Sequence, residues 1–443
     1  MSRQPPSPVI VVPGVTATYL RDHYPLPPET IWGVLDPTKR FERAQMHPSD
    51  LRYEAAQPAD VRADQIYEIA YSELIEELRF NLSSSPDEPT PVYPFAYDWR
   101  HPLAMTEERL AAFIDDVIGR TKLLRHYDEA GYAEAPKVNL VGHSMGGLVI
   151  AGYLERYGAA KLDRVASLAS PFRGSFESMV KIATGTANLG VRAPSSRERE
   201  AARVTPSIYH LFPDFETGVR TDPEDGFPRS TFDPDLIQPS IEDSVVAYAE
   251  RFALGRTKKE RTATGKKLLP LMLKEAERHR KRIAKLDLQK QGLSADRWLC
   301  VVGVGAKTRV RMTIESDRGR PVFRLTSDDL VDDWADETRD RTKTGDGTVH
   351  FEGAQPGFLR LENLVCVSPD DFGIWELQDR AVARLAGFHG ILPNMNMLHR
   401  LLVRHFTGAD DRRGNTWGRP APGVSKADWR PAVAPLKALE PDE

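Results

Sequence analysis

The sequence predicts an α/β protein with a mostly parallel sheet, helices on both faces of that sheet and a largely helical insertion. Short apolar runs bounded by turn residues alternate with segments of helical periodicity, which is typical of parallel strands connected through helices. A glycine-rich motif also places a sharp turn between one strand and the next helix. The expected strands cover residues 9–12, 92–99, 137–141, 164–170, 298–304 and 361–367, with a hairpin at 310–325.

The expected helices lie between and after these strands. The first covers residues 64–79, the second covers residues 106–127, a third follows the turn motif, and the last covers about residues 394–406. Glu107 and Glu108 would lie in the first turn of the second helix, where negative charge suits the helix dipole. The apolar face of the first helix consists of Ile66, Ile69, Ala70, Leu74 and Leu78.

The alternation of strands and helices stops after residue 171. Residues 172–296 hold few strand-like runs, and we expect them to form a cap or lid inserted into an α/β core. Residues 1–171 are then the first part of that core and residues 297–408 the second part. Residues 409–443 form a tail rich in proline, alanine and charge, which we expect to be loosely ordered.

Composition narrows the class of protein. The 443 residues include 60 Lys and Arg against 64 Asp and Glu, and the net charge of -4 gives no general case for nucleic-acid binding. Cys300 and Cys366 cannot form a disulfide framework. No apolar run approaches the roughly 18 residues of a membrane span, and the N-terminus makes a poor secretory signal. We expect a soluble cytoplasmic protein of undetermined oligomeric state, with export by a signal-independent route left open.

The string Gly142-His143-Ser144-Met145-Gly146 is the strongest functional signal in the chain. A strand is expected before it and an apolar helix after it, which is the context of a nucleophile elbow. The small residues let strand and helix approach closely, and the tight turn would present a hydroxyl above the sheet edge. An ordinary glycine-rich turn is the alternative. We predict that Ser144 is a nucleophile.

A serine nucleophile needs a base that is itself oriented by an acid, and both candidates lie downstream. In chains with this elbow the acid follows the serine and the histidine comes last. Asp346 lies on a glycine-flanked segment that is also typical of a plain turn. His389 lies between the last expected strand and the last helix. Asp346 would fix the tautomer of His389 through Nδ1, leaving Nε2 to accept the Ser144 proton.

Weaker candidates exist for both roles. His143, beside the serine, should point away from the hydroxyl, and His350 shares the loop of the acid. His399 and His405 would belong to the surface or packing face of the last helix. The alternative acids fall in a charged stretch that is typical of a solvated helix. In chain order these residues are His143, Asp332, Asp333, His350, His399 and His405.

The oxyanion hole should use two main-chain N–H groups. Met145, directly after the nucleophile, is one expected donor. Val15, on the loop after the first strand, is the other. A simple Pro-Gly turn ending a strand is the alternative interpretation of that loop.

Several separated segments resemble, in the same order, those of lecithin:cholesterol acyltransferase-like proteins, which include lysosomal-type phospholipases and bacterial relatives. The resemblance spans roughly residues 9–407 and implies an α/β-hydrolase fold with a cap and lid. It places the triad on Ser144, Asp346 and His389. It also implies cleavage of acyl esters of lipids, with acyl transfer when an alcohol outcompetes water. The segments are VIVVPGV (9–15), YDWR (97–100), GHSMGG (142–147), VTPSIYHLFP (204–213), VGVG (302–305) and GDGTV (345–349).

The chain departs from the secreted members of that family. Those proteins carry disulfides near the lid and membrane-binding elements, and two cysteines cannot reproduce the disulfides, so an extracellular lipoprotein role is not expected. Asp98 and Arg100 are expected to form a structural ion pair, with Trp99 in the core or lining the pocket.

Residues 251–290 form a basic tract, with 14 Lys and Arg and four acidic residues, hence +10. A solvated cap helix with a packing face is the simpler interpretation. The alternative is peripheral contact with anionic lipid head groups, to which each basic residue adds about 1 kcal/mol. Nucleic-acid binding is not favoured, because the tract lacks interleaved aromatic residues. The packing face would use Leu273, Ala276, Ile283 and Leu286.

Together these features predict a serine hydrolase that cleaves carboxylic esters, of lipids or phospholipids, through an acyl-enzyme. One alternative is an acyltransferase that passes the acyl group to an alcohol. A second is a catalytically inactive homologue that binds lipids or proteins. No metal or organic cofactor is expected, because the chain has no HExxH, zinc-type Cys/His spacing or Walker loop.

Overall fold

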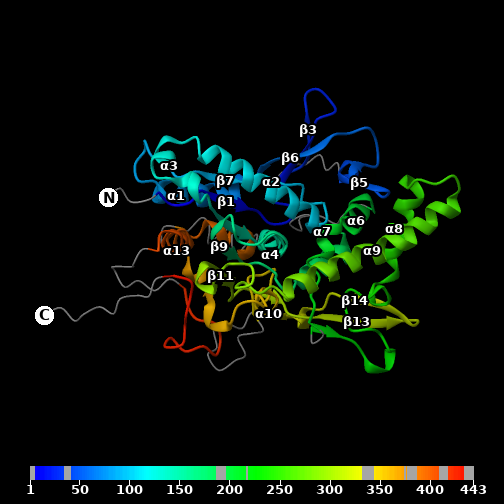
Figure 1. Ribbon diagram of the computed structural model, residues 1–443. Helices are drawn as coiled ribbons and strands as arrows, with labels where there is room; N and C mark the ends of the chain where they lie inside the picture. The colour runs from blue at the N-terminus through cyan, green and yellow to red at the C-terminus, as the bar shows by residue number, and fades with distance from the viewer. Residues whose placement is uncertain are drawn as a thin grey trace.

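The core of the molecule is a six-stranded sheet with the order β16-β11-β9-β8-β1-β7. Its strands β7, β1, β9 and β11 are labelled at the centre of the fold in Figure 1. The computed structural model describes residues 5–33, 41–185, 196–215, 218–331, 344–373, 376, 387–408 and 418–433. Every neighbouring pair in the sheet is parallel, so the predicted α/β class is confirmed. The strands are β1 Val9–Val12, β7 Val92–Pro94, β8 Val138–His143, β9 Leu162–Leu168, β11 Trp298–Gly303 and β16 Leu364–Val367.

Helices cover both faces of this sheet, which explains why its central strands are continuous apolar runs. In β1, Ile10 and Val12 pack with the face of α2 and α4, whereas Val9 and Val11 pack with the face of α1 and α13. Each face therefore has its own hydrophobic core. The covering helices are α1 Glu68–Leu82, α2 Leu103–Thr121, α4 Met145–Tyr157 and α13 Asn396–Thr407.

Two local predictions were wrong. Residues 64–66 belong to β6, Val61–Ile66, which pairs with β2, Thr18–Asp22, because strand pairing overrides the helical period there. Ile69 lies in α1 but is exposed rather than on the buried face of that helix. Glu107 does not lie in a first turn, because α2 begins at Leu103. It is fully buried and pairs with Arg282.

The chain between β9 and β11 is largely helical and gathers on one side of the molecule (Figure 1). Its apolar residues form a third core, which also includes Met312 and Phe323 of the predicted hairpin. The limits of the cap, residues 172–296, stay a prediction. The elements are α5 Phe176–Thr184, α6 Ser196–Arg203, α7 Pro206–Tyr209, β10 Val219–Arg220, α8 Pro239–Phe252 and α9 Lys258–Ala284, with the hairpin strands β13 Met312–Asp317 and β14 Arg320–Arg324.

The C-terminal segment and several short strands and helices surround the core. Part of the expected tail is packed rather than loose, because Trp429 Nε1 donates to the Leu364 carbonyl of β16 at 2.7 Å. No helix in the described ranges is long and apolar enough to cross a membrane. The remaining strands and short α-helices are β3 Glu29–Trp32, β4 Met46–His47, β5 Asp50–Glu54, β12 Thr308–Arg309, β15 Leu330–Val331, α3 Arg125–Glu129, α10 Phe351–Ala354 and α12 Phe388–Ile391.

The predicted ion pair between Asp98 and Arg100 is confirmed. Arg100 donates from Nε and Nη2 to the two carboxylate oxygens of Asp98 at 2.9 and 2.6 Å, and Nη2 also contacts Glu54 at 3.1 Å. Burial alone would raise the pKa of Asp98, but the guanidinium holds it below its ordinary value. Trp99 packs edge-on against Trp32 in the core.

Candidate active site

Ser144 occupies a sharp turn between β8 and α4. Its backbone has φ 53° and ψ -125°, a conformation that costs on the order of 1–3 kcal/mol in a residue other than glycine. The Ser144 N–H donates to the Leu168 carbonyl at 2.9 Å, which anchors the turn to the neighbouring strand. At Gly146 a Cβ would lie 2.1 Å from the Val12 carbonyl oxygen, so only glycine fits there.

The side chains of the three predicted catalytic residues meet at this turn. His389 Nε2 lies 2.9 Å from Ser144 Oγ, and His389 Nδ1 lies 2.7 Å from Asp346 Oδ2. In the tautomer that satisfies both contacts, Nδ1–H donates to the carboxylate and Nε2 accepts from the serine hydroxyl. The residues come from three distant parts of the chain, after β8, after β15 and in α12.

Asp346 is fixed by its own loop. Its Oδ1 accepts hydrogen bonds from the N–H groups of Thr348 and Val349 at 2.9 and 2.7 Å. The His389 N–H donates to the Asp346 carbonyl at 3.0 Å, which joins the acid loop to the histidine loop. At Gly303, where β11 ends, a Cβ would lie 2.5 Å from the Asp346 Cβ, so the strand end leaves room for the acid.

The loop after β1 borders the nucleophile. A Cβ placed on Gly14 would lie 3.0 Å from Ser144 Cβ and 3.4 Å from its Oγ. Met145 is the first residue of α4, so its N–H has no acceptor within the helix. The structure records no hydrogen bond of the Val15 N–H to the described residues. Of the two predicted oxyanion donors, Met145 thus follows the serine directly in the chain, and Val15 lies on the loop that borders it.

Two buried residues that support this site were not identified as such from the sequence. Tyr71, on α1, contacts His143 Nδ1 through its hydroxyl at 2.7 Å. His143 Nε2 lies 3.0 Å from the His389 carbonyl. As expected, His143 does not point at the Ser144 hydroxyl. The position of His143 beside the serine was the only feature of the sequence that pointed to this role. Nothing in the sequence distinguished Tyr71.

The alternative histidines lie away from the triad. His350 is buried between Phe176 and Phe215, and burial lowers its pKa to about 3. His399 contacts the Pro393 carbonyl and His405 the Val165 carbonyl, so both belong to packing faces of α13. The alternative acids, Asp332 and Asp333, lie outside the described residues.

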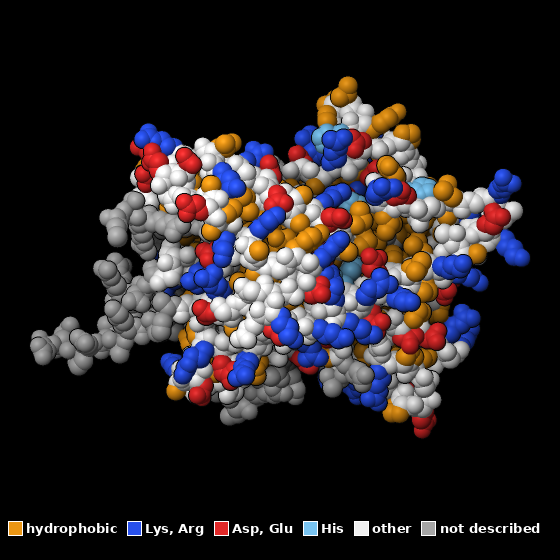
Figure 2. All heavy atoms as spheres, viewed as in Figure 1, with side chains coloured by type: hydrophobic (Ala, Val, Ile, Leu, Met, Phe, Trp, Pro, Cys, Tyr) orange, Lys and Arg blue, Asp and Glu red, His pale blue; other side chains and the backbone are white. Residues whose placement is uncertain are grey.

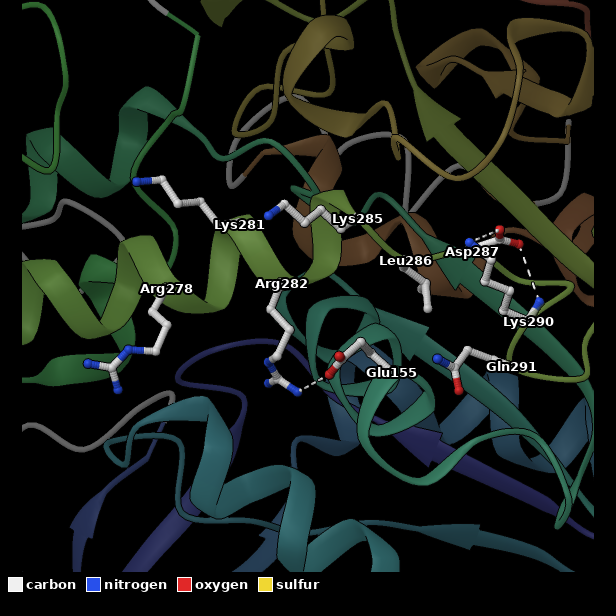
Figure 3. A pocket seen from close by; sticks show the side chains of 9 residues that line it. All are labelled: Glu155, Arg278, Lys281, Arg282, Lys285, Leu286, Asp287, Lys290 and Gln291. Atoms are coloured by element: carbon white, nitrogen blue, oxygen red, sulfur yellow. Dashed lines mark hydrogen bonds and ion pairs between the residues drawn. The ribbon is translucent and has the colours of Figure 1, made fainter.

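A polar cleft of about 370 Å³ lies elsewhere, between the C-terminal halves of α4 and α9 (Figure 3). None of the three triad candidates lines it. Its lining is net positive, with five Lys or Arg side chains and two acidic ones, of which Arg282 pairs with Glu155 at 2.8 Å and Lys290 with Asp287 at 3.4 Å. The lining residues are Glu155, Arg278, Lys281, Arg282, Lys285, Leu286, Asp287, Lys290 and Gln291.

No cluster of three or more His, Cys, Asp or Glu side chains in the described ranges could hold a metal ion. The expectation that the protein needs no cofactor stays a prediction.

Similarity to the chain from the Tle4–Tli4 complex agrees with this architecture. The crystal structure of the Tle4–Tli4 complex contains a chain with 15% sequence identity and a TM-score of 0.54, over 80% of this chain and 89% of that one. Phospholipase PlaB from Legionella pneumophila in complex with thio-NAD matches at 10% identity and a TM-score of 0.33, over 90% of this chain and 62% of that chain. No curated protein matches the sequence.

The parallel sheet, the elbow after β8 and the Tle4 similarity identify an α/β-hydrolase fold. The sequence profile of the lecithin:cholesterol acyltransferase family matches residues 71–355, well over half of the chain. That range includes the serine elbow and the acid loop, whereas His389 lies beyond it. The chain belongs to the lecithin:cholesterol acyltransferase family.

Proposed function

We propose that this protein is a serine carboxylic-ester hydrolase that acts on lipid or phospholipid esters. Family membership supports a lipid ester hydrolase or acyltransferase activity. The observation that carries the proposal is the position of His389, whose two ring nitrogens contact Ser144 and Asp346 at 2.9 and 2.7 Å. A serine hydroxyl bonded to an oriented imidazole is an activated nucleophile.

The proposed reaction proceeds through an acyl-enzyme. Ser144 Oγ attacks the ester carbonyl while its proton passes to His389 Nε2. The N–H groups of Val15 and Met145 stabilise the oxyanion of the tetrahedral intermediate. The imidazolium then gives its proton to the leaving alcohol. Water then attacks the acyl carbon while His389 takes its proton, and the imidazolium returns that proton to Ser144 Oγ as the bond to the acyl group breaks.

The acyltransferase alternative shares every step up to the acyl-enzyme. An alcohol then replaces water as the acceptor. Product analysis after adding a soluble alcohol separates the two activities: a new ester that accumulates faster than free fatty acid indicates transfer, and free acid alone indicates hydrolysis.

A fluorophosphonate probe tests the nucleophile and the inactive-homologue alternative together. We expect the probe to label the wild-type chain and not Ser144→Ala. Esterase activity should fall by about 10⁴- to 10⁶-fold in that variant. Ser178→Ala is the matched control, because Ser178 is a buried serine bonded to the Ser175 carbonyl on α5. A Ser144→Ala activity within tenfold of wild type would rule the proposal out.

The substrate class is tested with p-nitrophenyl esters of increasing acyl length beside phospholipid vesicles. We expect long-chain or bilayer substrates to be preferred over short soluble esters. Residues 172–296 are the proposed cap, and exchanging residues within it should alter acyl preference without abolishing probe labelling of Ser144.

We also propose that the basic tract contacts anionic lipid through one face of α9. The spacing of Lys259, Lys266, Lys267 and Lys274 places them on one side of the helix, where all four are exposed. In the described part of the chain none of these lysines has a carboxylate partner, unlike several cations of the polar cleft. Lys and Arg side chains spread across this region of the surface (Figure 2).

Vesicle co-sedimentation tests that contact. Changing these four lysines to glutamine should weaken binding to phosphatidylserine-containing vesicles by about 4 kcal/mol, since each contributes about 1 kcal/mol. High salt should have the same effect on wild type. The control makes an equal change of charge at four exposed residues elsewhere, Lys122, Arg229, Lys307 and Lys426. Equal binding by wild type and the α9 variant would disprove the contact.

A further inference from the structure

A chain of hydrogen bonds runs behind the triad, from the loop after β1 to the backbone of the histidine loop. The Gly14 N–H donates to the Tyr71 hydroxyl at 3.0 Å. That hydroxyl lies 2.7 Å from His143 Nδ1, and His143 Nε2 lies 3.0 Å from the His389 carbonyl oxygen. The chain therefore connects the loop of one proposed oxyanion donor to the residue of the proposed base.

The direction of every bond in this chain is determined by its ends. A carbonyl oxygen only accepts, so His143 Nε2 must carry a proton and donate to His389. A neutral imidazole then has Nδ1 free to accept, and the Tyr71 hydroxyl supplies that proton. The hydroxyl oxygen in turn accepts from the Gly14 main-chain N–H. Each donor is used once and no member is left unsatisfied.

Burial keeps His143 and Tyr71 in these protonation states. Tyr71 is 1% exposed and His143 is 4% exposed. Burial, followed by the nearby His389 ring, holds the pKa of His143 well below its ordinary value, so the imidazole is neutral at pH 7. Burial raises the pKa of Tyr71, so the hydroxyl keeps its proton.

We infer that Tyr71 and His143 are positioning residues that hold the loop after β1 and His389 in register around Ser144. This inference rests on the proposed hydrolase function and adds to it a device outside the triad. His143 acts on the main chain of His389, and Tyr71 acts on both His143 and the loop of Val15. Neither side chain has a hydrogen bond to Ser144 Oγ or to a ring nitrogen of His389.

The proposed role follows from the geometry of the reaction. Attack requires the Ser144 hydroxyl, the imidazole and the oxyanion donors to be aligned at the same moment, and a misplacement of about 1 Å costs on the order of 10²-fold in rate. The oxyanion loop and the histidine loop come from opposite ends of the chain. The rings of His143 and His389 also lie 5.0 Å apart between centroids, so a neutral His143 adds no repulsion when His389 becomes an imidazolium.

Tyr71→Phe removes only the hydroxyl that joins two links of the chain. We expect kcat to fall by about 10- to 100-fold, with KM within threefold of wild type, because the substrate contacts are unchanged. Tyr127→Phe is the matched control: Tyr127 is fully buried and its hydroxyl donates to the Pro6 carbonyl, far from Ser144 in the fold. We expect that variant to lose thermal stability without losing kcat.

Two substitutions at His143 separate positioning from mere packing. His143→Gln keeps a neutral amide that both donates and accepts, whereas His143→Phe keeps the bulk and neither hydrogen bond. We expect Gln to retain at least five times the kcat of Phe at equal melting temperature. Nitrogen NMR of labelled histidine should show His143 as the Nε2–H tautomer, with its Nδ1 signal shifted by Tyr71→Phe.

The outcomes distinguish this inference from the function on which it rests. If wild type is not labelled by fluorophosphonate at Ser144, the hydrolase proposal fails. If wild type is labelled but folded Tyr71→Phe keeps kcat within twofold, or His143→Phe equals His143→Gln, the positioning role is overturned and the hydrolase proposal stands. If Tyr71→Phe does not fold, the His143 pair and the NMR measurement still decide the question.

Discussion

Among the described residues, two buried carboxylate–histidine pairs at hydrogen-bonding distance differ in what lies beyond the imidazole. Asp346 contacts His389 at 2.7 Å, and Glu107 contacts His279 at 3.0 Å. Both acids are almost completely buried, at 1% and 0% exposure. If only the carboxylate and the imidazole are considered, either pair resembles the acid and the base of a catalytic triad.

The second nitrogen of each ring separates the pairs. His389 presents Nε2 to the Ser144 hydroxyl, so proton transfer has a partner. The Nδ1 of His279 has no hydrogen-bond partner among the described residues, and its ring packs edge-on against His210 at 5.1 Å between centroids. Glu107 is also shared with Arg282. We therefore interpret the Glu107 pair as a clamp between α2 of the core and α9.

The comparison shows that a buried acid and a histidine do not by themselves define a site. The chemistry requires a nucleophile on the far side of the ring and a backbone that presents it, as the strained elbow at Ser144 does.

Replacing each acid by its amide sharpens the comparison, and the largest effect is expected at Asp346→Asn. An amide facing Nδ1 favours the wrong tautomer of His389, so kcat should fall by about 10⁴-fold. Steady-state kinetics on a chromogenic ester measures this loss. Thermal unfolding should show a folded protein, and a kcat within tenfold of wild type would mean that Asp346 does not orient the base.

Glu107→Gln should give the opposite pattern, with a loss of stability rather than rate. Removing one partner of a buried ion pair costs about 3–5 kcal/mol, and the remaining Arg282–Glu155 contact at 2.8 Å should reduce that loss to about 2–3 kcal/mol. Urea unfolding measures the free energy. The folded fraction should keep kcat within about threefold, as expected if this pair has no part in the reaction. A large loss of kcat at unchanged stability would contradict the clamp.

The sequence was sufficient to predict the sheet and the three triad candidates. The sheet strands are buried on both faces and so appear as continuous apolar runs, and the elbow requires glycine where Val12 approaches Gly146. Asp346 and His389 could be selected because the order of the triad along the chain restricts the choice.

What the sequence did not reveal depends on contacts between distant residues. Glu107 is predicted in the first turn of a helix, and its buried pairing could not be foreseen because its partner, Arg282, lies 175 residues away. Tyr71 has ordinary surroundings in the sequence, and only the fold brings it within 2.7 Å of His143. Residues 64–66 follow a helical period, yet pairing with β2 makes them a strand.

The smallest expected effect is on the pH dependence of the unfolding free energy, to which the histidine of the Glu107 pair contributes. Burial, followed by Arg282 and Arg280, holds the pKa of His279 well below its ordinary value. Below about pH 6.5 the unfolded chain binds a proton at this residue and the native protein does not. The free energy of unfolding therefore decreases by about 1.4 kcal/mol for each unit by which the pH is lowered, for this group. His279→Gln keeps a donor for Glu107 and removes that proton site.

We therefore expect the unfolding free energy of His279→Gln to decline less steeply than that of wild type between about pH 6.5 and 5.5. The two curves should run parallel above pH 7. Buried histidines away from this pair, including His143 and His350, act equally in both proteins. His210 packs against the His279 ring, which also lowers the His210 pKa, so the difference between the curves reports on His279 together with its effect on His210. His23→Gln, at an exposed position, is the control and should follow wild type. Identical slopes for wild type and His279→Gln would mean that folding leaves the pKa of His279 unchanged, which would contradict a buried neutral imidazole. A shallower decline for wild type would mean that His279 is protonated in the native state, and the Glu107 pair would then be an ionic bridge.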